Sequence, residues 1–423
     1  MTRGGGANEA MKAEIIAVGS ELLTPDRIDT NSLYLTRKLN EAGFTVHLKC
    51  VVGDNLEDIE NLLRAARRRS RLIVLCGGLG PTEDDLTRAA TALALGRPLR
   101  RSAEALEALH RRFALRATAM ARINERQADM VEGAEMLNNP TGTAPGMWIE
   151  ADGACIALLP GPPREMQAMF ESQVIPRLVK LGTRRRLEQR FFSMQGLSES
   201  EVDSRIAPIY KSYSAIQTTI LASTGIISLR LQRWLDAGEA PSDLDELAGK
   251  IRSELGDFIF TTSDERLEEV VGRLLRQSGR SLAIAESCTA GMIATAITRV
   301  PGSSEYFRGG VICYSNQLKV DLCRVPAALL EQHGAVSAEV AEALASGIRE
   351  VTDSSIGLSV TGIAGPGGGS EAKPVGLVYI GLADAARCLH LRRIFASDRD
   401  TVRELSMNTA LGRLRRFLVE TTP

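Results

Sequence analysis

The sequence predicts an α/β protein in which two doubly wound α/β domains are joined by a small α+β domain. Three observations lead to this prediction. Apolar, β-rich runs alternate with helical segments up to about residue 178, a strand-rich stretch without that alternation follows, and the alternation then returns. A chain of 423 residues is long enough for about three domains. We expect a short disordered lead followed by three domains, at 1–10, 11–178, 179–262 and 263–423.

The first domain should form a parallel sheet, because each predicted strand is followed by a predicted helix. Gly43 and Gly96 stand where helices commonly end. The predicted strands lie at 13–19, 46–53 and 71–78, the predicted helices at 31–44, 56–70 and 84–96, and a further strand–loop–helix unit at 155–173.

The last domain repeats this pattern after a middle segment that is strand-rich and carries a helix at 242–255. Its predicted strands lie at 281–287, 309–315, 355–362 and 374–384, and its predicted helices at 265–279, 288–300, 337–352 and the C-terminal end. The basic run at 184–186 favours a solvated surface, since aromatic residues follow it without being interleaved.

Composition excludes several classes of protein. The formal net charge is -1, which argues against a dedicated nucleic-acid or membrane-surface binder. The seven cysteines are scattered without a CxxC pair, so neither a disulfide framework nor a cysteine-based zinc site is expected. Any metal should be a hard cation on carboxylates and phosphates. No apolar run is long enough to span a membrane and no secretion signal is visible, so we expect a cytoplasmic protein.

A glycine-rich loop follows the predicted strand at 71–78. Gly77, Gly78 and Gly80 can bring backbone N–H groups close to a phosphate, and the next helix offers its N-terminus. Asp84 and Asp85 either cap that helix or hold Mg²⁺ beside the phosphate, and their adjacency favours the metal. Two further Gly/Pro loops, at 139–146 and 159–165, favour a pocket for a phosphorylated ligand in this domain.

A second candidate site starts at Ser287, at a strand-to-helix junction. There a hydroxyl can be presented and backbone N–H groups at 288–290 can stabilise an oxyanion, although a serine in this position often only caps a helix. No histidine motif supplies a triad, so Lys319 with a depressed pKa, assisted by the hydroxyl of Tyr314, is the candidate base. Cys288 is better explained as a buried structural thiol.

The loop at 361–369 contains five glycines and follows another predicted strand. It could hold phosphate or ribose, with Lys373 and Arg399 as the cations that neutralise a phosphate.

These motifs resemble the CinA family, the competence/damage-inducible protein A family. The resemblance rests on AEIIAVGSELL, GGLGPTEDDLTR, NNPTGTAPG and LLPGPPREM in the first domain, and on AESCTAG, VPGSSEYFRGGVICYSNQLKV and SVTGIAGPGGG in the last. It implies an N-terminal domain with the molybdopterin-binding MoaB/MogA fold, a KH-like middle domain and a C-terminal nicotinamide mononucleotide deamidase domain. The middle domain lacks a GxxG loop, so KH-type RNA clamping is unsupported.

The resemblance further implies a bifunctional hydrolase of pyridine-nucleotide salvage. Its deamidase would convert nicotinamide mononucleotide to nicotinic acid mononucleotide and ammonia without a metal, and its first domain would be a divalent-metal-dependent ADP-ribose pyrophosphatase. In the deamidase the catalytic residues would be Ser287, Tyr314 and Lys319 and the substrate-binding residues Thr289, Thr361, Gly362, Gly365 and Arg399. In the first domain Gly77, Gly78, Gly80 and Thr82 would bind phosphate, and Asp84 and Asp85 the metal. The resemblance also implies a homodimer.

The sequence departs from the family pattern at three positions. Ala290 replaces a glycine that a helix start should tolerate, Ser397 replaces a glycine near Arg399, and Glu83 adds a carboxylate beside the metal candidates. Three alternatives remain open: water could attack the amide directly, the first domain could bind a pterin or nucleotide without hydrolysis, and the protein could be a non-enzymatic partner in competence or DNA-damage response.

Overall fold

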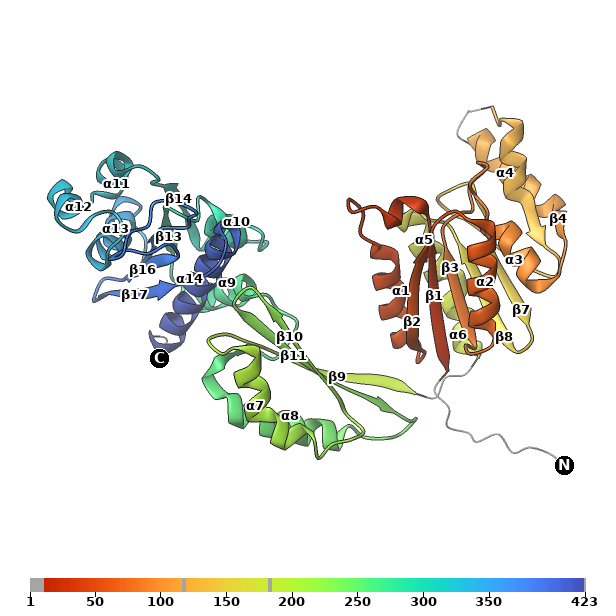
Figure 1. Ribbon diagram of the computed structural model, residues 1–423, viewed down its shortest axis with the longest axis horizontal. Coiled ribbons are helices and arrows are strands. Elements are labelled where there is room, and N and C mark those ends of the chain that lie inside the picture. Colours follow the sequence, from red (N-terminus) through yellow and green to blue (C-terminus); the bar gives the residue numbers. More distant parts are fainter. Residues whose placement is uncertain (1–10, 116–118, 182–184, 422–423) are drawn as a thin grey trace. The chain divides into compact units, whose positions relative to one another are not determined.

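The computed structural model describes residues 11–115, 119–181 and 185–421 (Figure 1). The predicted disordered lead at 1–10 and Arg184 of the basic run therefore lie outside the described residues. The chain divides into two compact units, one of Met1–Glu188 with Trp234–Ala240 and one of Gln189–Arg233 with Pro241–Pro423. No helix among the described residues is both long enough and apolar enough to cross a bilayer.

The first unit is built on a six-stranded sheet in the order β2-β1-β3-β8-β7-β6, in which β2, β1, β3 and β8 are parallel. Its strands are β1 (Lys12–Val18), β2 (Thr45–Val52), β3 (Leu72–Cys76), β6 (Glu135–Leu137), β7 (Gly146–Ala151) and β8 (Ala154–Leu159), with β4 (Leu99–Arg101) and β5 (Asp129–Val131) as a separate pair. Its α-helices are α1 (Thr30–Glu41), α2 (Leu56–Arg67), α3 (Thr87–Leu95), α4 (Ala103–Leu115), α5 (Pro163–Met169) and α6 (Ile175–Lys180).

Both faces of this sheet are covered by helices, as Figure 1 shows for the red to yellow part of the chain. Successive side chains of a strand point to opposite faces, so neighbours enter different cores. Ile15 and Val74 pack in one apolar cluster, and Ile16 and Ile73 in the other. The central strands β3 and β8 are therefore buried and apolar along their whole length, which is typical of buried parallel strands, whereas the edge strand β2 is mixed in polarity.

The second unit contains two sheets. The four-stranded sheet, in the order β10-β11-β9-β12, has its own apolar core with two helices and matches the predicted α+β segment. Its elements are β9 (Arg186–Met194), α7 (Glu199–Tyr210), β10 (Gln217–Ser223), β11 (Ile226–Leu235), α8 (Ser242–Leu255) and β12 (Ile259–Thr261). The boundaries at 178 and 262 stay a prediction, since this sheet and the sheet that follows share one compact unit.

The five-stranded sheet has the order β14-β13-β15-β16-β17, with β13, β14 and β15 parallel and β16 and β17 antiparallel. Its strands are β13 (Leu282–Glu286), β14 (Phe307–Ile312), β15 (Ile356–Gly362), β16 (Leu377–Ala383) and β17 (Cys388–Ile394). Its helices are α9 (Leu267–Ser278), α10 (Met292–Thr298), α11 (Asn316–Cys323), α12 (Ala327–His333), α13 (Ala338–Val351) and α14 (Arg399–Thr421). The predicted α/β class is confirmed for both large domains.

Three local predictions differ from the structure. Helix α3 begins at Thr87, later than predicted, so Asp84 and Asp85 lie in the loop before it. Helix α10 begins at Met292, so Ser287 is not its cap. Strand β17 was not predicted, because its mixed polar sequence CLHLRRI lacks the apolar run of a central strand.

Candidate active sites

Ser287 follows β13, at the carboxyl end of the parallel part of its sheet. Its amide donates to Val360 O at 3.0 Å, which ties the residue to the neighbouring strand β15. The side chain of Glu286 turns under the next loop and is almost fully buried. Its carboxylate accepts hydrogen bonds from the amides of Gly291, Ile293 and Ala294 at 2.9–3.2 Å. Glu286 therefore accepts the hydrogen bonds of the free amides at the N-terminus of α10, as a serine cap would otherwise do. The Ser287 hydroxyl is then not needed as a helix cap.

Lys319 lies on α11, and its side chain is only 1% exposed. Its Nζ donates to Ser287 Oγ at 3.3 Å, to Cys313 O at 2.8 Å and to Tyr314 O at 3.3 Å. Burial lowers the pKa of Lys319, because the ammonium form loses its hydration. The two carbonyls orient the amine, and a neutral amine in this place can accept the proton of the Ser287 hydroxyl.

The loop after Ser287 holds a candidate oxyanion site. The amide of Ala290 donates to Ser287 O at 3.2 Å, so it is already used. Thr289 is fully buried, and within the described residues neither its amide nor its hydroxyl has a hydrogen-bond partner. Buried polar groups are rarely left unpaired, so Thr289 offers two free donors close to the nucleophile. Its role in substrate binding stays a prediction.

Arg403 is a residue that the sequence analysis missed. Its guanidinium donates to Cys288 O at 3.2 Å and to Thr289 O at 3.3 Å. Both carbonyls are thereby turned toward α14, which fixes the orientation of the peptide groups after Ser287. The signal that could have found it is its spacing, since it follows Arg399 by one helical turn on α14.

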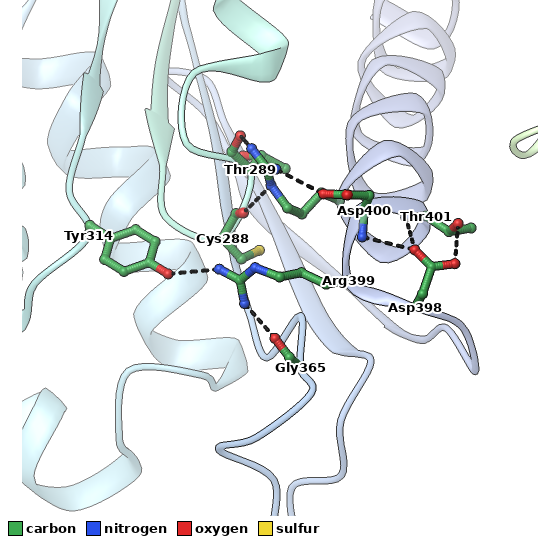
Figure 2. Close-up of polar contacts among 9 residues, drawn as sticks. Cys288, Thr289, Tyr314, Gly365, Asp398, Arg399, Asp400 and Thr401 are labelled. Atoms are coloured by element: carbon green, nitrogen blue, oxygen red, sulfur yellow. Dashed lines mark hydrogen bonds and ion pairs between the residues drawn. The ribbon is translucent and has the colours of Figure 1, made fainter. Parts of the chain in front are cut away.

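Tyr314 and Arg399 form a second pair at the same end of the sheet. Arg399 Nη2 donates to Tyr314 Oη at 3.2 Å, and Arg399 Nη1 donates to Gly365 O (Figure 2). Tyr314 is 57% exposed, so its ring is accessible to a substrate. Its hydroxyl contacts Arg399 and only its carbonyl contacts Lys319, which differs from the expected relay between Tyr314 and the lysine.

The glycine loop at 361–369 is held by its own contacts. Thr361 is buried and its Oγ1 donates to Ala335 O at 2.8 Å, and Lys373 Nζ donates to His333 O at 2.6 Å. A Cβ at Gly362 would stand 2.9 Å from Leu377 O, so this glycine serves the packing of β16. Of the residues predicted here, Gly365 is the one that meets Arg399.

In the first unit, the glycine loop after β3 is built for close packing. Gly77 has φ +112, and a Cβ there would stand 2.0 Å from Val18 O. A Cβ at Gly80 would stand 2.4 Å from Asp85 Oδ2. The buried side chain of Arg88, which the sequence analysis missed, donates to Leu79 O and Gly80 O at 2.6 Å. The loop therefore has a fixed shape before any ligand binds.

The two aspartates of this loop have different environments. Asp85 accepts hydrogen bonds from Gly80 N at 2.7 Å, Thr82 N at 2.8 Å and Thr82 Oγ1 at 2.6 Å, so it organises the loop. Local hydrogen bonding lowers the pKa of Asp84, which keeps this exposed carboxyl ionised. Glu83 points elsewhere and pairs with Arg126, so the expectation that it strengthens a metal site has no support in the geometry.

The three predicted Gly/Pro loops line one hollow of about 310 Å³. Its polar lining comes from Glu21, Asp54, Gln127 and Glu165 in addition to the two aspartates. A second hollow of about 400 Å³ shares Val18, Glu21, Gly161 and Pro162 with it. No group of three or more potential metal ligands occurs in the part of the chain that the structure describes. Asp84 and Asp85 therefore fit a cation only when phosphate oxygens and water complete its coordination, as Mg²⁺ accepts.

Two family models match separate parts of this chain. Residues 14–180 match the family described as a probable molybdopterin binding domain, and residues 264–418 match the CinA C-terminal domain. A CinA-like protein of Solibacter usitatus is 48% identical over 413 residues, which cover 97% of this chain and 99% of the relative. A putative competence-damage inducible protein of Moorella thermoacetica is 43% identical and covers 96% of this chain and 99% of its own length.

Solved structures match part of the chain. The protein CinA of Thermoplasma acidophilum has a TM-score of 0.38 at 32% identity and covers 40% of this chain and 98% of its own. The molybdopterin biosynthesis enzyme MoaB of Thermus thermophilus has a TM-score of 0.29 at 25% identity and covers 41% of this chain and 96% of its own.

Proposed function

This chain belongs to the CinA family, and from that premise we propose that it carries two hydrolytic sites, one in each unit. In the second unit the proposed reaction is the hydrolysis of nicotinamide mononucleotide to nicotinic acid mononucleotide and ammonia. The observation that carries this proposal is the buried amine of Lys319, 3.3 Å from Ser287 Oγ. A buried lysine beside a serine hydroxyl is a general base and nucleophile pair that needs no histidine.

The proposed mechanism starts with neutral Lys319. Its Nζ takes the hydroxyl proton of Ser287 as Oγ attacks the carboxamide carbon, and the developing oxyanion is stabilised by the free donors of Thr289. The C–N bond then breaks, and the proton held by Lys319 passes to the leaving nitrogen, so that ammonia departs. Water, deprotonated by the same amine, hydrolyses the acyl-serine to the carboxylic acid and regenerates the enzyme.

Arg399 is the proposed holder of the 5′-phosphate. Its guanidinium contacts Tyr314 and Gly365 but forms no ion pair within the described residues, so its charge is available for an anion. The exposed ring of Tyr314 lies beside it and can contact the substrate as the phosphate docks.

The test is ammonia release from nicotinamide mononucleotide by the full-length protein in the presence of EDTA. We expect release by the wild type and a loss of about a thousandfold or more in Ser287→Ala. The matched control is Cys288→Ala at the next position, whose buried thiol has its pKa raised to about 12 and should not react. Wild-type activity in Ser287→Ala, or its loss only in Cys288→Ala, would refute the serine mechanism.

For the first unit we propose cleavage of the pyrophosphate of ADP-ribose. The supporting observation is the polar hollow of about 310 Å³ in which the preshaped glycine loop meets Asp84. A divalent cation bound there would neutralise charge on the pyrophosphate. Backbone amides of the glycine loop would orient the phosphates, while Asp85 keeps the loop in shape.

A binding role without hydrolysis is the rival for this unit, because the molybdopterin-binding fold also serves ligand binding alone. Release of AMP from ADP-ribose in Mg²⁺, abolished by EDTA, would support the hydrolase. A tightly bound fluorescent pterin in the purified protein, together with no AMP release, would support the rival.

A further inference from the structure

A separate hollow of about 280 Å³ lies in the second unit, where the end of β9, strand β17 and helix α14 meet. Neither Ser287 nor any other residue of the proposed deamidase site lines it. Its lining comes from four stretches of the chain, namely residues 195–197, Gly225, residues within 391–395 and residues within 405–416.

Three arginines and no carboxylate line this hollow. The guanidinium groups of Arg393, Arg413 and Arg416 form no ion pair with any described residue, and their one side-chain hydrogen bond in this part of the chain runs from Arg393 Nη1 to the carbonyl of the preceding residue at 3.0 Å. Like charges that converge on one space repel each other, and an anion between them removes that cost. The helix dipole favours arginines near the end of α14 but does not explain the arginine on β17.

The walls of the hollow are held in place by close packing. A Cβ at Gly412 would stand 1.6 Å from Gln195 Oε1, so only glycine lets this side chain lie against α14. Gln195 Nε2 then donates to Asn408 O at 2.7 Å. Gly196 has φ +93, and Arg416 Nη2 lies 3.2 Å from the position of its missing Cβ. The end of β9 is thus fixed against the arginine-bearing face of the helix.

Backbone donors and apolar surface complete the lining. Within the described residues the amides of Gly196 and Leu197 make no hydrogen bond, so they add N–H groups beside Arg416. Leu197, Leu391, Phe395 and Leu405 supply an apolar wall. Guanidinium and amide donors suit phosphate oxygens, and an aromatic and aliphatic wall suits a planar ring.

We propose that this hollow is a second ligand site of the protein, which binds a nucleoside monophosphate through Arg393, Arg413 and Arg416. The phosphate would be held by the guanidinium groups and by the amides at 196–197, with the base against Phe395. The site is independent of the proposed reactions, because it shares no lining residue with either candidate active site.

The test uses two neighbouring arginines of β17. Arg393 lines the hollow and Arg392 does not, so Arg393→Gln and Arg392→Gln remove the same charge from adjacent, exposed positions. Calorimetric titration of the full-length protein with AMP should show that Arg393→Gln loses one binding event or weakens it by about tenfold or more. Arg392→Gln should bind as the wild type does, and both variants should keep ammonia release.

Hydrogen exchange locates the binding event. AMP should slow exchange of the amides at 196–197 in the wild type and in Arg392→Gln but not in Arg393→Gln. Equal AMP binding by the two variants, or no protection at 196–197, would overturn the proposal. Protection by inorganic phosphate as strong as that by AMP would overturn the role of the base, and protection by single-stranded RNA alone would replace a small ligand with a nucleic acid.

Discussion

Lys319 shows how one residue acquires a chemical role from its surroundings. On the sequence it is one cation among 51 lysines and arginines. In the structure its amine is buried against two carbonyls and the Ser287 hydroxyl, and burial lowers its pKa. A lower pKa increases the neutral fraction near neutral pH, and only the neutral amine can act as a base.

The sign of the pH dependence follows from this. Ammonia release should be low where Lys319 is protonated and should rise as the pH increases through the lowered pKa of this residue. It should level off at a pH below the ordinary pKa of a free lysine, roughly 10.4. Measurement of kcat/KM against pH checks the midpoint. Lys319→Arg should be inactive at every pH, because arginine stays protonated. An unchanged profile in that variant would exclude the lysine as the base.

Ala290 is the second residue whose meaning changed with the structure. From the sequence we expect Ala290 to be tolerated in place of a family glycine. In the structure the residue has φ +48, in the left-handed region that favours glycine. Ala290→Gly should therefore raise the free energy of unfolding by about 1 kcal/mol, measured by urea denaturation. The matched control is Ala294→Gly inside α10, which should lower it by about 1 kcal/mol. A loss of stability in Ala290→Gly would contradict the strain.

At the scale of the element, α13 decides where α11 and its lysine lie. A Cβ at Gly347 of α13 would stand 1.7 Å from the carbonyl oxygen of Cys323, which is the last residue of α11. The glycine thus permits a helix-to-helix contact that no other residue would allow. The sequence shows a glycine inside a helix, and only the packing shows why it is needed.

Gly347→Ala should accordingly lower the free energy of unfolding by about 2 kcal/mol and reduce ammonia release, because α11 must shift. The control is Gly249→Ala in α8, because the Cβ position of Gly249 is surrounded by open space. This substitution should raise the free energy of unfolding by up to about 1 kcal/mol. Thermal or urea unfolding of both variants gives the comparison. Equal changes in the two would show that helix propensity alone, without the contact to Cys323, governs both positions.

At the scale of the whole molecule, the two candidate sites use residues from different units. The glycine loop with Asp84 belongs to the first unit, and Ser287, Lys319 and Arg403 belong to the second. Each site is completed by side chains from its own unit in the described structure, so the two proposed activities should be separable by single substitutions.

We expect Asp84→Ala to reduce pyrophosphate cleavage roughly a hundredfold while ammonia release is unchanged, and Ser287→Ala to do the reverse. Both reactions would be measured on the same preparations of full-length protein. The control in the first unit is Glu83→Ala, which removes an exposed carboxylate paired with Arg126 and should retain pyrophosphate cleavage. If each substitution abolished both reactions, the two-site proposal would fail.

The sequence by itself determined the α/β class, the order of most elements and the loops that line both sites. These follow from local signals: apolar runs mark buried strands, helical periodicity marks the helices, and glycines after strands mark the loops. The starts of α3 and α10 were predicted too early. The carboxylates of Asp85 and Glu286 accept hydrogen bonds from amides five to eight residues away, and a local sequence pattern does not reveal such contacts. Strand β17 was missed because an edge strand needs no apolar run.

Only the tertiary structure decided which groups meet. Arg403 acts on the Ser287 loop from more than a hundred residues away, and the Tyr314 hydroxyl contacts Arg399 instead of the lysine. The hollow lined by Arg393, Arg413 and Arg416 joins four stretches of the chain that share no motif. Such contacts depend on how strands and helices pack, and a local sequence pattern carries no information about the partner that packing places opposite a side chain.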